Sequence, residues 1–205
     1  CSSDLESMPI DSALLDIETL GTNADAVVVS VGIVAIDSTK DYTYKELIDN
    51  GFYVTLDVKS QVDSGRKIDK DTLAWWGTQG DEAMKVLEPS KDDIHWNQLL
   101  PAIFNYFKEV EASPKDVLVY ARGSHFDFGI LHDLFRVTGD AGAYDLPWRW
   151  WNIHDSKTVQ ITLLDEKIDV HPEGFIHHNA LHDAAREYMN IQLAIYKFQQ
   201  TLEGK

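Results

Sequence analysis

Two acidic residues separated by one position follow an apolar run near the start of the chain. Asp16 and Glu18 come directly after Ala13-Leu14-Leu15, a segment typical of a buried strand. Because successive strand side chains point to opposite faces, both carboxylates would project from the same face. Two like charges held this close raise one another's pKa unless a cation lies between them. A hard divalent ion with oxygen ligands, Mg²⁺ or Mn²⁺, suits such a pair.

A third carboxylate follows another apolar run in the middle of the chain. Val117-Leu118-Val119-Tyr120 predicts a buried strand flanked by helices. Asp127 would lie in the first turn of the helix that leaves this strand. A carboxylate at a helix N-terminus is stabilised by the helix dipole. Asp127 therefore has either a structural role there or a role beside the first pair.

A histidine and an aspartate five positions apart open the last helical pattern of the chain. On one continuous helix, His178 and Asp183 would point about 140° apart. We therefore expect His178 in the preceding loop and Asp183 on the helix, facing Asp16 and Glu18. A histidine titrates near neutrality and suits a general base. His177 and His182 are the competing candidates, and each also fits an ordinary surface or core histidine.

Strands come first and helices alternate with strands later. Residues 26–36 form a β-branched run that predicts a long strand antiparallel to the first, and residues 51–56 predict a third strand in a meander. Helices are expected after Asp69 or Asp71, after Asp81, from Asp92 or Asp93 onward, over 126–137, from Asp155 to Leu164, and over 179–198. This order predicts a single-domain α/β fold with a ribonuclease H-like mixed sheet flanked by helices.

Composition limits the classes of protein that this chain can be. Its 205 residues, 44% apolar and 11% aromatic, suit one domain with a sizeable core. No run approaches the roughly 18 apolar residues of a membrane helix, and no signal peptide is evident, so we expect a soluble, cytoplasmic protein, in the host cytoplasm if phage-encoded. The single cysteine, Cys1, excludes an internal disulfide and a cysteine zinc cluster. Residues 1–8 are expected to be a leader or cloning remnant, and residues 9–205 the functional domain.

The charge balance is strongly acidic. There are 34 acidic and 18 basic residues, giving a net charge of −16. Proteins that coat nucleic acid through many phosphate contacts are usually basic, so that class is disfavoured. An enzyme that grips one end of a nucleic acid chain through bound metal ions is compatible with this charge.

Together, the three acidic motifs resemble the DEDDh 3′-to-5′ exonuclease superfamily. The shared order is Asp-x-Glu on a strand, Phe-Asp after a buried strand, and His-x4-Asp at the final helix. The resemblance spans nearly the whole chain and is most similar to the group of DexA-type exonucleases of T-even phages and RNase AS-type exoribonucleases of mycobacteria. The segments that carry it are Lys59-Ser60-Gln61, Gly65-Arg66, Asp71-Thr72-Leu73-Ala74-Trp75-Trp76, Tyr120-Ala121-Arg122-Gly123, Trp151-Asn152-Ile153-His154-Asp155 and Gly174-Phe175-Ile176.

This resemblance implies a two-metal phosphodiesterase with Mg²⁺ or Mn²⁺. It implies that Asp16 bridges both ions, that Glu18 and Asp183 complete the site of the nucleophilic water, that Asp127 supports the second ion, and that His178 is the general base. The implied reaction is 3′-to-5′ hydrolysis of single-stranded DNA to 5′-mononucleotides. An RNase AS-type exoribonuclease is the alternative. A catalytically silent nucleic-acid-binding or scaffold module is an alternative of another class, which the presence of all five residues disfavours.

Substrate contacts are expected around the first motif. The resemblance implies that Thr19 and Leu20 meet the terminal nucleotide, with Leu20 as a wedge against a base. Trp75 and Trp76 occupy consecutive helical positions, so their side chains point in different directions and cannot both face the core in the same way. Either one of them stacks a base, which is worth about 1–3 kcal/mol, or both only pack.

Two arginines are scarce positive charges in this acidic chain. Arg66 and Arg122 are candidates for contacts to substrate phosphates. The alternative for each is an ordinary salt bridge within the protein.

Overall fold

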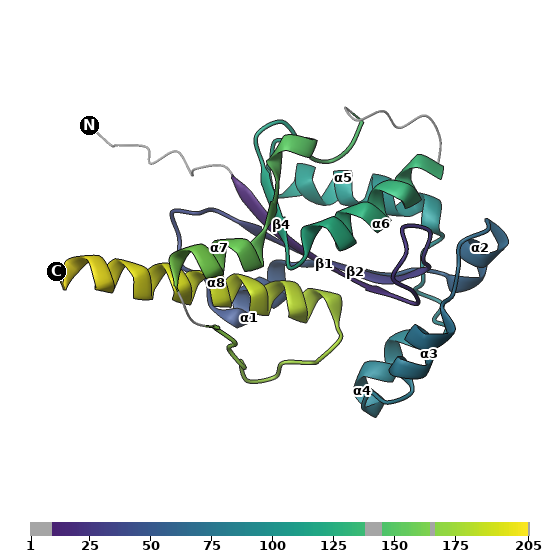
Figure 1. The fold of residues 1–205 in the computed structure, drawn as a ribbon. Helices are drawn as coiled ribbons and strands as arrows, with labels where there is room; N and C mark the ends of the chain where they lie inside the picture. The colour runs from purple at the N-terminus through teal and green to yellow at the C-terminus, as the bar shows by residue number, and fades with distance from the viewer. Residues whose placement is uncertain (1–9, 138–144, 165–166, 205) are drawn as a thin grey trace.

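A five-stranded mixed sheet forms the centre of the molecule (Figure 1). The computed structural model describes residues 10–137, 145–164 and 167–204, so the expected leader lies outside the described residues. The strand order is β3-β2-β1-β4-β5, with β2 antiparallel to β1 and β3, and β4 parallel to β1 and β5. The strands are β1 Ser12–Thr19, β2 Val28–Ile36, β3 Phe52–Thr55, β4 Leu118–Ala121 and β5 Ile153–Asp155. The predicted single α/β domain with a mixed sheet is confirmed.

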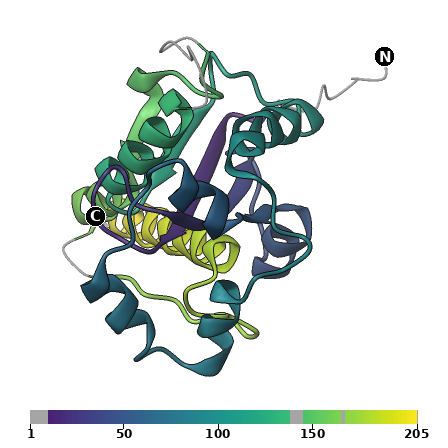
Figure 2. The same ribbon diagram turned by 90° about the vertical axis from the view of Figure 1, so that its right-hand side faces the viewer.

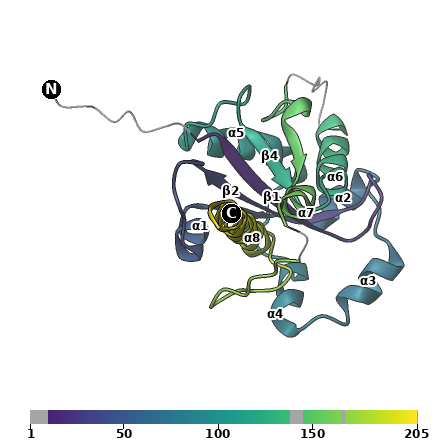
Figure 3. The ribbon, with the colours of Figure 1, turned by 60° about the vertical axis from the view of Figure 1, so that its left-hand side comes forward.

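Helices cover both faces of this sheet. The helices are α1 Tyr44–Asn50, α2 Val58–Asp63, α3 Lys70–Trp76, α4 Asp81–Met84, α5 Leu99–Glu109, α6 Ser124–Val137, α7 Ser156–Leu163 and α8 Ala180–Glu203. Figures 1 and 3 show α5 and α6 on one face, and α8 with α1 and α7 on the other. Figure 2 shows α3, α4 and the loop before α8 at the same end of the molecule. None of the described helices combines the length and apolar character needed to cross a membrane.

The alternation along β1 decides which face carries the acidic pair. Leu15 and Ile17 pack into the core beneath α5 and α6, whereas Leu14 packs with residues of α8 on the opposite face. Because side chains alternate along a strand, Asp16 and Glu18 share the face of Leu14. Both carboxylates are therefore directed toward the side covered by α8.

The predicted meander is wrong in one respect, because α1 separates β2 from β3. Thr43 caps this helix, and Thr43 and Glu46 form a capping box in which each side chain bonds the other's backbone N–H. The helix expected from Asp92 or Asp93 begins only at Leu99, since Ile94 instead makes a β-bridge with Leu56. The short α2 and the three-residue edge strand β5 were also not predicted. Their lengths are too small for a periodic pattern to emerge.

Candidate active site

The segment of β1 that carries the acidic pair extends past the end of its parallel neighbour. Strand β4 pairs with β1 only from Ser12 to Leu14, whereas β2 pairs with Asp16 and Glu18 through Gly32 and Ser30. On the β4 side, the backbone of β1 therefore has no strand partner at the acidic pair. That open edge admits a group from α6.

Asp127 fills this opening. It lies in the first turn of α6, is 3% exposed, and accepts a hydrogen bond of 3.2 Å from the backbone N–H of Ile17 to its Oδ1. A buried backbone N–H without a partner is costly, so this bond is a strong constraint on the side chain. It places the third carboxylate against the peptide between Asp16 and Glu18.

Gly32 allows α8 to deliver the fourth carboxylate. A Cβ atom at Gly32, which pairs with Asp16, would lie 2.2 Å from the backbone of Ala180 and Leu181. Only glycine permits this approach of a helix to a strand. Asn179 caps α8 by accepting the N–H groups of Leu181 and His182. Asp183, in the first turn, is thereby brought over the acidic pair.

Glu18, His178 and Asp183 converge on one point. One ligand atom from each lies within 4.8 Å of the others, although the residues come from β1, the loop before α8, and α8 itself. His178 lies in that loop, as its spacing from Asp183 indicates, with a left-handed φ of 57°. Its ring meets Trp75 and Trp76 edge-on, with centroid distances of 4.9 and 5.9 Å.

Burial and mutual repulsion make the carboxylate cluster hard to ionise. Loss of solvent raises the pKa of Asp16 well above its ordinary value, and the charges of Asp127, Glu18 and Asp183 raise it further. Burial is also the main cause that raises the pKa of Glu18 to about 8, of Asp127 to about 7 and of Asp183 to about 6. Such groups ionise together only when cations compensate them, and hard divalent ions prefer oxygen ligands. The donor set therefore fits a Mg²⁺ or Mn²⁺ site.

Two contacts of Asp183 limit how far its pKa is raised. Arg186 Nη2 donates to Asp183 Oδ1 at 2.8 Å, and both this charge and a hydrogen bond from the backbone N–H of His178 lower the pKa of Asp183. Burial lowers the pKa of the His178 imidazole, and His177 and Arg186 lower it further. His178 is therefore neutral near pH 7, the form that accepts a proton.

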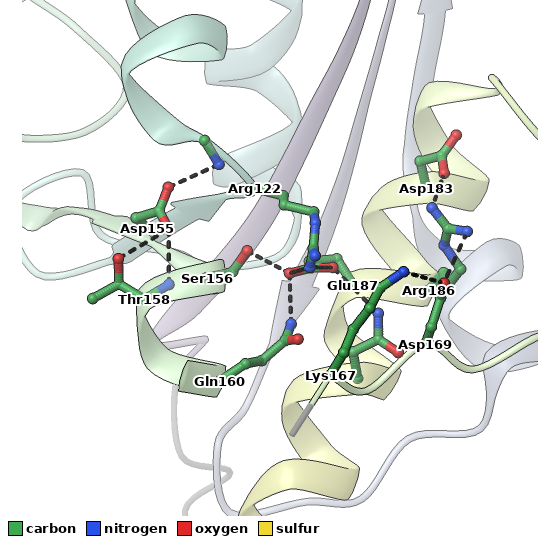
Figure 4. A network of polar contacts seen from close by, with 12 residues as sticks. Arg122, Asp155, Ser156, Thr158, Gln160, Lys167, Asp169, Asp183, Arg186 and Glu187 are labelled. Carbon is green, nitrogen blue, oxygen red and sulfur yellow. Dashed lines mark hydrogen bonds and ion pairs between the residues drawn. The ribbon is translucent and has the colours of Figure 1, made fainter. Parts of the chain in front are cut away.

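A buried glutamate behind the site was not predicted from the sequence. Glu187 lies on α8 one turn after Asp183 and is 6% exposed. Its carboxylate accepts from Ser156 Oγ at 2.6 Å, Gln160 Nε2 at 2.7 Å and Arg122 Nη1 at 3.2 Å. Figure 4 shows these three side chains around Glu187. The sequence did hold one indication that Glu187 lies near the site, because it follows Asp183 by four residues on the same helix face. Glu187 ties α7 to α8 and holds Arg122 in a salt bridge.

Asp155 also has a structural role. Its Oδ1 accepts from the N–H of Thr158 (Figure 4). Its Oδ2 accepts from the backbone N–H groups of Gly123 and Ser124. The expected helix cap at Asp155 is confirmed. One side chain thus fixes the starts of α6 and α7 together.

Arg66 does not lie where it can contact a substrate phosphate. It is 5% exposed, and its guanidinium donates to the carbonyls of Ala26 and Ala24 and to Asp133, at 2.8, 3.0 and 3.0 Å. The prediction that Arg66 contacts a substrate phosphate is therefore wrong, and Arg66 instead forms an internal salt bridge with Asp133. A buried guanidinium needs several acceptors, and two carbonyls before β2 together with Asp133 of α6 supply them.

Leu20 and Trp76 are core residues. Leu20 is 5% exposed and packs with Trp76 in a small cluster, so the wedge expected of Leu20 is not available in this structure. Trp76 is fully buried, and its Nε1 donates to the carbonyl of Thr19 at 2.9 Å. Trp75, the other tryptophan of the pair, is 43% exposed.

Two open cavities border residues of the site. One of about 430 Å³ is lined by Glu18, Thr19, Trp75 and Phe126, among others. The other, of about 460 Å³, is lined by Tyr53, His178 and Asn179 together with residues of the 82–93 segment. Since Glu18 borders the first cavity and His178 the second, a ligand in either would reach the cluster.

Comparison with known proteins assigns this arrangement to a family. Residues 11–194 match the family described as the 3′-5′ exoribonuclease Rv2179c-like domain. The chain belongs to that family. The exodeoxyribonuclease of Enterobacteria phage T4 is 28% identical to this Rv2179c-like domain over 200 residues, which cover 89% of the chain and 88% of the phage protein.

Solved structures share the fold of this Rv2179c-like domain. Cell-death related nuclease 4 (CRN-4) matches with a TM-score of 0.58 and 13% identity, over 94% of this chain and 65% of that chain. Product-bound exonuclease I matches with a TM-score of 0.57 and 10% identity, over 96% of this chain and 46% of that chain. The domain thus spans less than two thirds of these solved chains. The expected family resemblance is confirmed, and the domain is a 3′-5′ exonuclease.

Proposed function

We propose that this exonuclease removes 5′-mononucleotides from the 3′ end of single-stranded DNA by metal-dependent hydrolysis. The observation that carries the proposal is the convergence of Glu18, His178 and Asp183 within 4.8 Å, beside Asp16 and Asp127. The similarity to an exodeoxyribonuclease over nearly the full length of both chains supports DNA as the polymer.

Asp16, Glu18, Asp127 and Asp183 would hold a pair of Mg²⁺ or Mn²⁺ ions. When bound, such ions neutralise charge on the phosphate and lower the pKa of the attacking water. The raised carboxylate pKa values support this assignment, because four acids that are largely shielded from water and repel one another have a strong tendency to bind cations.

The residues of the chain itself position the substrate and move the proton. His178, neutral and within reach of the acidic cluster, takes the proton of the attacking water. Trp75 lines the cavity that borders Glu18 and offers an exposed indole for stacking on the terminal base. Thr19 lines the same cavity, which supports a contact between this residue and the terminal nucleotide. Its hydroxyl donates to the carbonyl of Gly21 at 2.7 Å.

A 3′ exoribonuclease is the second candidate. The description of the matching family, an exoribonuclease-like domain, favours it. The sugar of RNA carries a 2′-hydroxyl that DNA lacks, and the protein must either bind or exclude this group.

The deciding experiment uses one sequence in two polymers. Single-stranded DNA and RNA, labelled at the 3′ or the 5′ end, are incubated with the protein in Mg²⁺, Mn²⁺ or EDTA, and Asp16→Asn is the matched inactive control. We expect mononucleotides to be released from the 3′ end of DNA, faster than from RNA, and no release in EDTA. Faster release from RNA would establish the second candidate. Release from the 5′ end, or internal cleavage, would overturn both.

A further inference from the structure

His182 makes two contacts through one ring nitrogen. Its Nδ1 accepts the backbone N–H of Ile176 at 3.2 Å and lies 2.6 Å from the hydroxyl of Tyr44 on α1. A backbone N–H can only donate, so Nδ1 carries a lone pair and the ring proton of neutral His182 resides on Nε2. Burial raises the pKa of Tyr44 to about 12, so its hydroxyl keeps its proton and donates as well.

The amide that His182 accepts belongs to the loop that carries the general base. Ile176 precedes His178 by two residues, and the His178 side chain lies with that of Asp183, the residue that follows His182. His178 has a φ of 57°, a left-handed conformation that is uncommon outside glycine and costs energy. The surrounding contacts must therefore hold the backbone in place.

Arg186, one turn further along α8, secures the outer part of the same loop. Its guanidinium bonds Asp183 and lies 3.7 Å from Asp169 (Figure 4). It also lies 4.5 Å from the centre of the Phe175 ring. Arg186 contacts loop side chains, whereas His182 contacts the loop backbone close to His178. His182 thus holds the loop backbone two residues before the base.

We propose that His182 is a positioning residue for His178. By accepting the Ile176 N–H while Tyr44 fixes its ring, His182 holds the loop so that the His178 imidazole reaches Glu18 and Asp183. The inference rests on the proposed function, because it assigns His178 as the base. It also separates the two histidines: His182 uses Nδ1 as an acceptor and has its proton on Nε2, so it is not a competing base.

Three substitutions of His182 separate the effect of its hydrogen bond from the effect of the size of its ring. His182→Asn keeps an acceptor near the position of Nδ1, His182→Gln moves it one bond further, and His182→Leu removes it. We expect His182→Leu to lower kcat by about 10–100-fold with little change in KM, because a displacement near 1 Å can cost about 100-fold. His182→Asn should stay within a few-fold of wild type, and His182→Gln should resemble the leucine variant.

A double-mutant cycle tests whether the effect acts through His178. In a His178→Ala background, His182→Leu should cause no further loss of kcat, because the group that it positions is absent. An equal loss in both backgrounds, or an asparagine variant as slow as the leucine variant, would overturn the proposal. Tyr44→Phe provides a second variant, in which the loop amide keeps its acceptor and kcat should fall less than in His182→Leu.

Amide hydrogen exchange tests the link without activity. In the metal-free protein, the Ile176 amide should exchange slowly in wild type and His182→Asn, and at least tenfold faster in His182→Leu. Circular dichroism melting checks that each variant is folded. If wild type releases no nucleotides, the proposed function fails. Hydrogen exchange at Ile176 still shows whether His182 holds the loop. Unchanged exchange at Ile176 in folded His182→Leu would overturn the inference itself.

Discussion

The backbone N–H of Ile17 donates a hydrogen bond of 3.2 Å to Oδ1 of Asp127, a residue 110 positions later in the chain. The bond lies beyond the part of β1 that pairs with β4. It therefore gives a partner to the Ile17 N–H, which no neighbouring strand bonds on that side. The same contact brings the carboxylate of Asp127 beside Asp16, whose pKa it raises. One hydrogen bond therefore completes the strand and assembles the acidic cluster.

Asp16→Asn should abolish hydrolysis and stabilise the metal-free protein. The substitution removes a charge that is shielded from water and repelled by four neighbouring acids, Asp127, Glu18, Asp183 and Glu187. In EDTA, each kcal/mol of relieved repulsion should raise Tm by about 2–4 °C in a chain of this size. Mn²⁺ at 100 times its Kd should stabilise wild type by about 2.7 kcal/mol and the variant much less. Calorimetry with and without Mn²⁺ measures both effects, and near-wild-type turnover of the variant would contradict the metal-ligand role.

Glu18→Gln should make the metal-free protein more stable, increasingly so as pH rises. The folded pKa of Glu18, about 8, lies above its unfolded value of 4.5, so folded wild type binds more protons between these values. Wild type then loses stability relative to the variant from about pH 4.5 up to about pH 8, at no more than about 1.4 kcal/mol per pH unit. Urea unfolding of both proteins in EDTA at several pH values measures this difference. A difference that shrinks with rising pH would show that Glu18 is not destabilised as a carboxylate.

His178→Ala should lower kcat by about 10²–10⁴-fold while affecting substrate binding much less. The imidazole supplies a proton acceptor and is half-buried beside Trp75, so its removal leaves the carboxylates in place. Single-turnover kinetics with 3′-labelled DNA and filter binding in Ca²⁺ separate the two effects. His177→Ala is the matched control, and an equal loss of kcat in that variant would move the base role to His177.

Trp75→Ala and Trp76→Ala should have opposite consequences. Trp75 is 43% exposed at the cavity, so its loss should weaken substrate binding by about 1–3 kcal/mol with little change in Tm. Trp76 is fully buried and bonds Thr19, so its loss should cost about 3–5 kcal/mol of unfolding free energy. KM measurements and denaturant unfolding of both variants test the pair. An unchanged KM in Trp75→Ala would exclude base stacking on this indole.

The sequence by itself determined the features that depend on neighbouring residues. The alternation around Asp16 and Glu18 indicated one shared face, and the five-residue spacing of His178 and Asp183 indicated a loop followed by a helix. The helix cap at Asp155 was likewise predictable, because capping requires only a side-chain acceptor and the next turn of backbone. Periodicity and capping are local, so they can be read without knowing the fold.

Tertiary structure alone decided which distant groups meet and which are buried. Arg66 carries a charge that suggests a phosphate contact, yet carbonyls and Asp133 from other segments enclose it. Nothing in the sequence indicates the role of Gly32, which is to let the backbone of α8 approach β2 closely. The tautomer of His182 depends on a loop amide and a tyrosine from α1. Burial, repulsion and hydrogen-bond partners depend on packing between remote segments, and no spacing within a single segment contains that information.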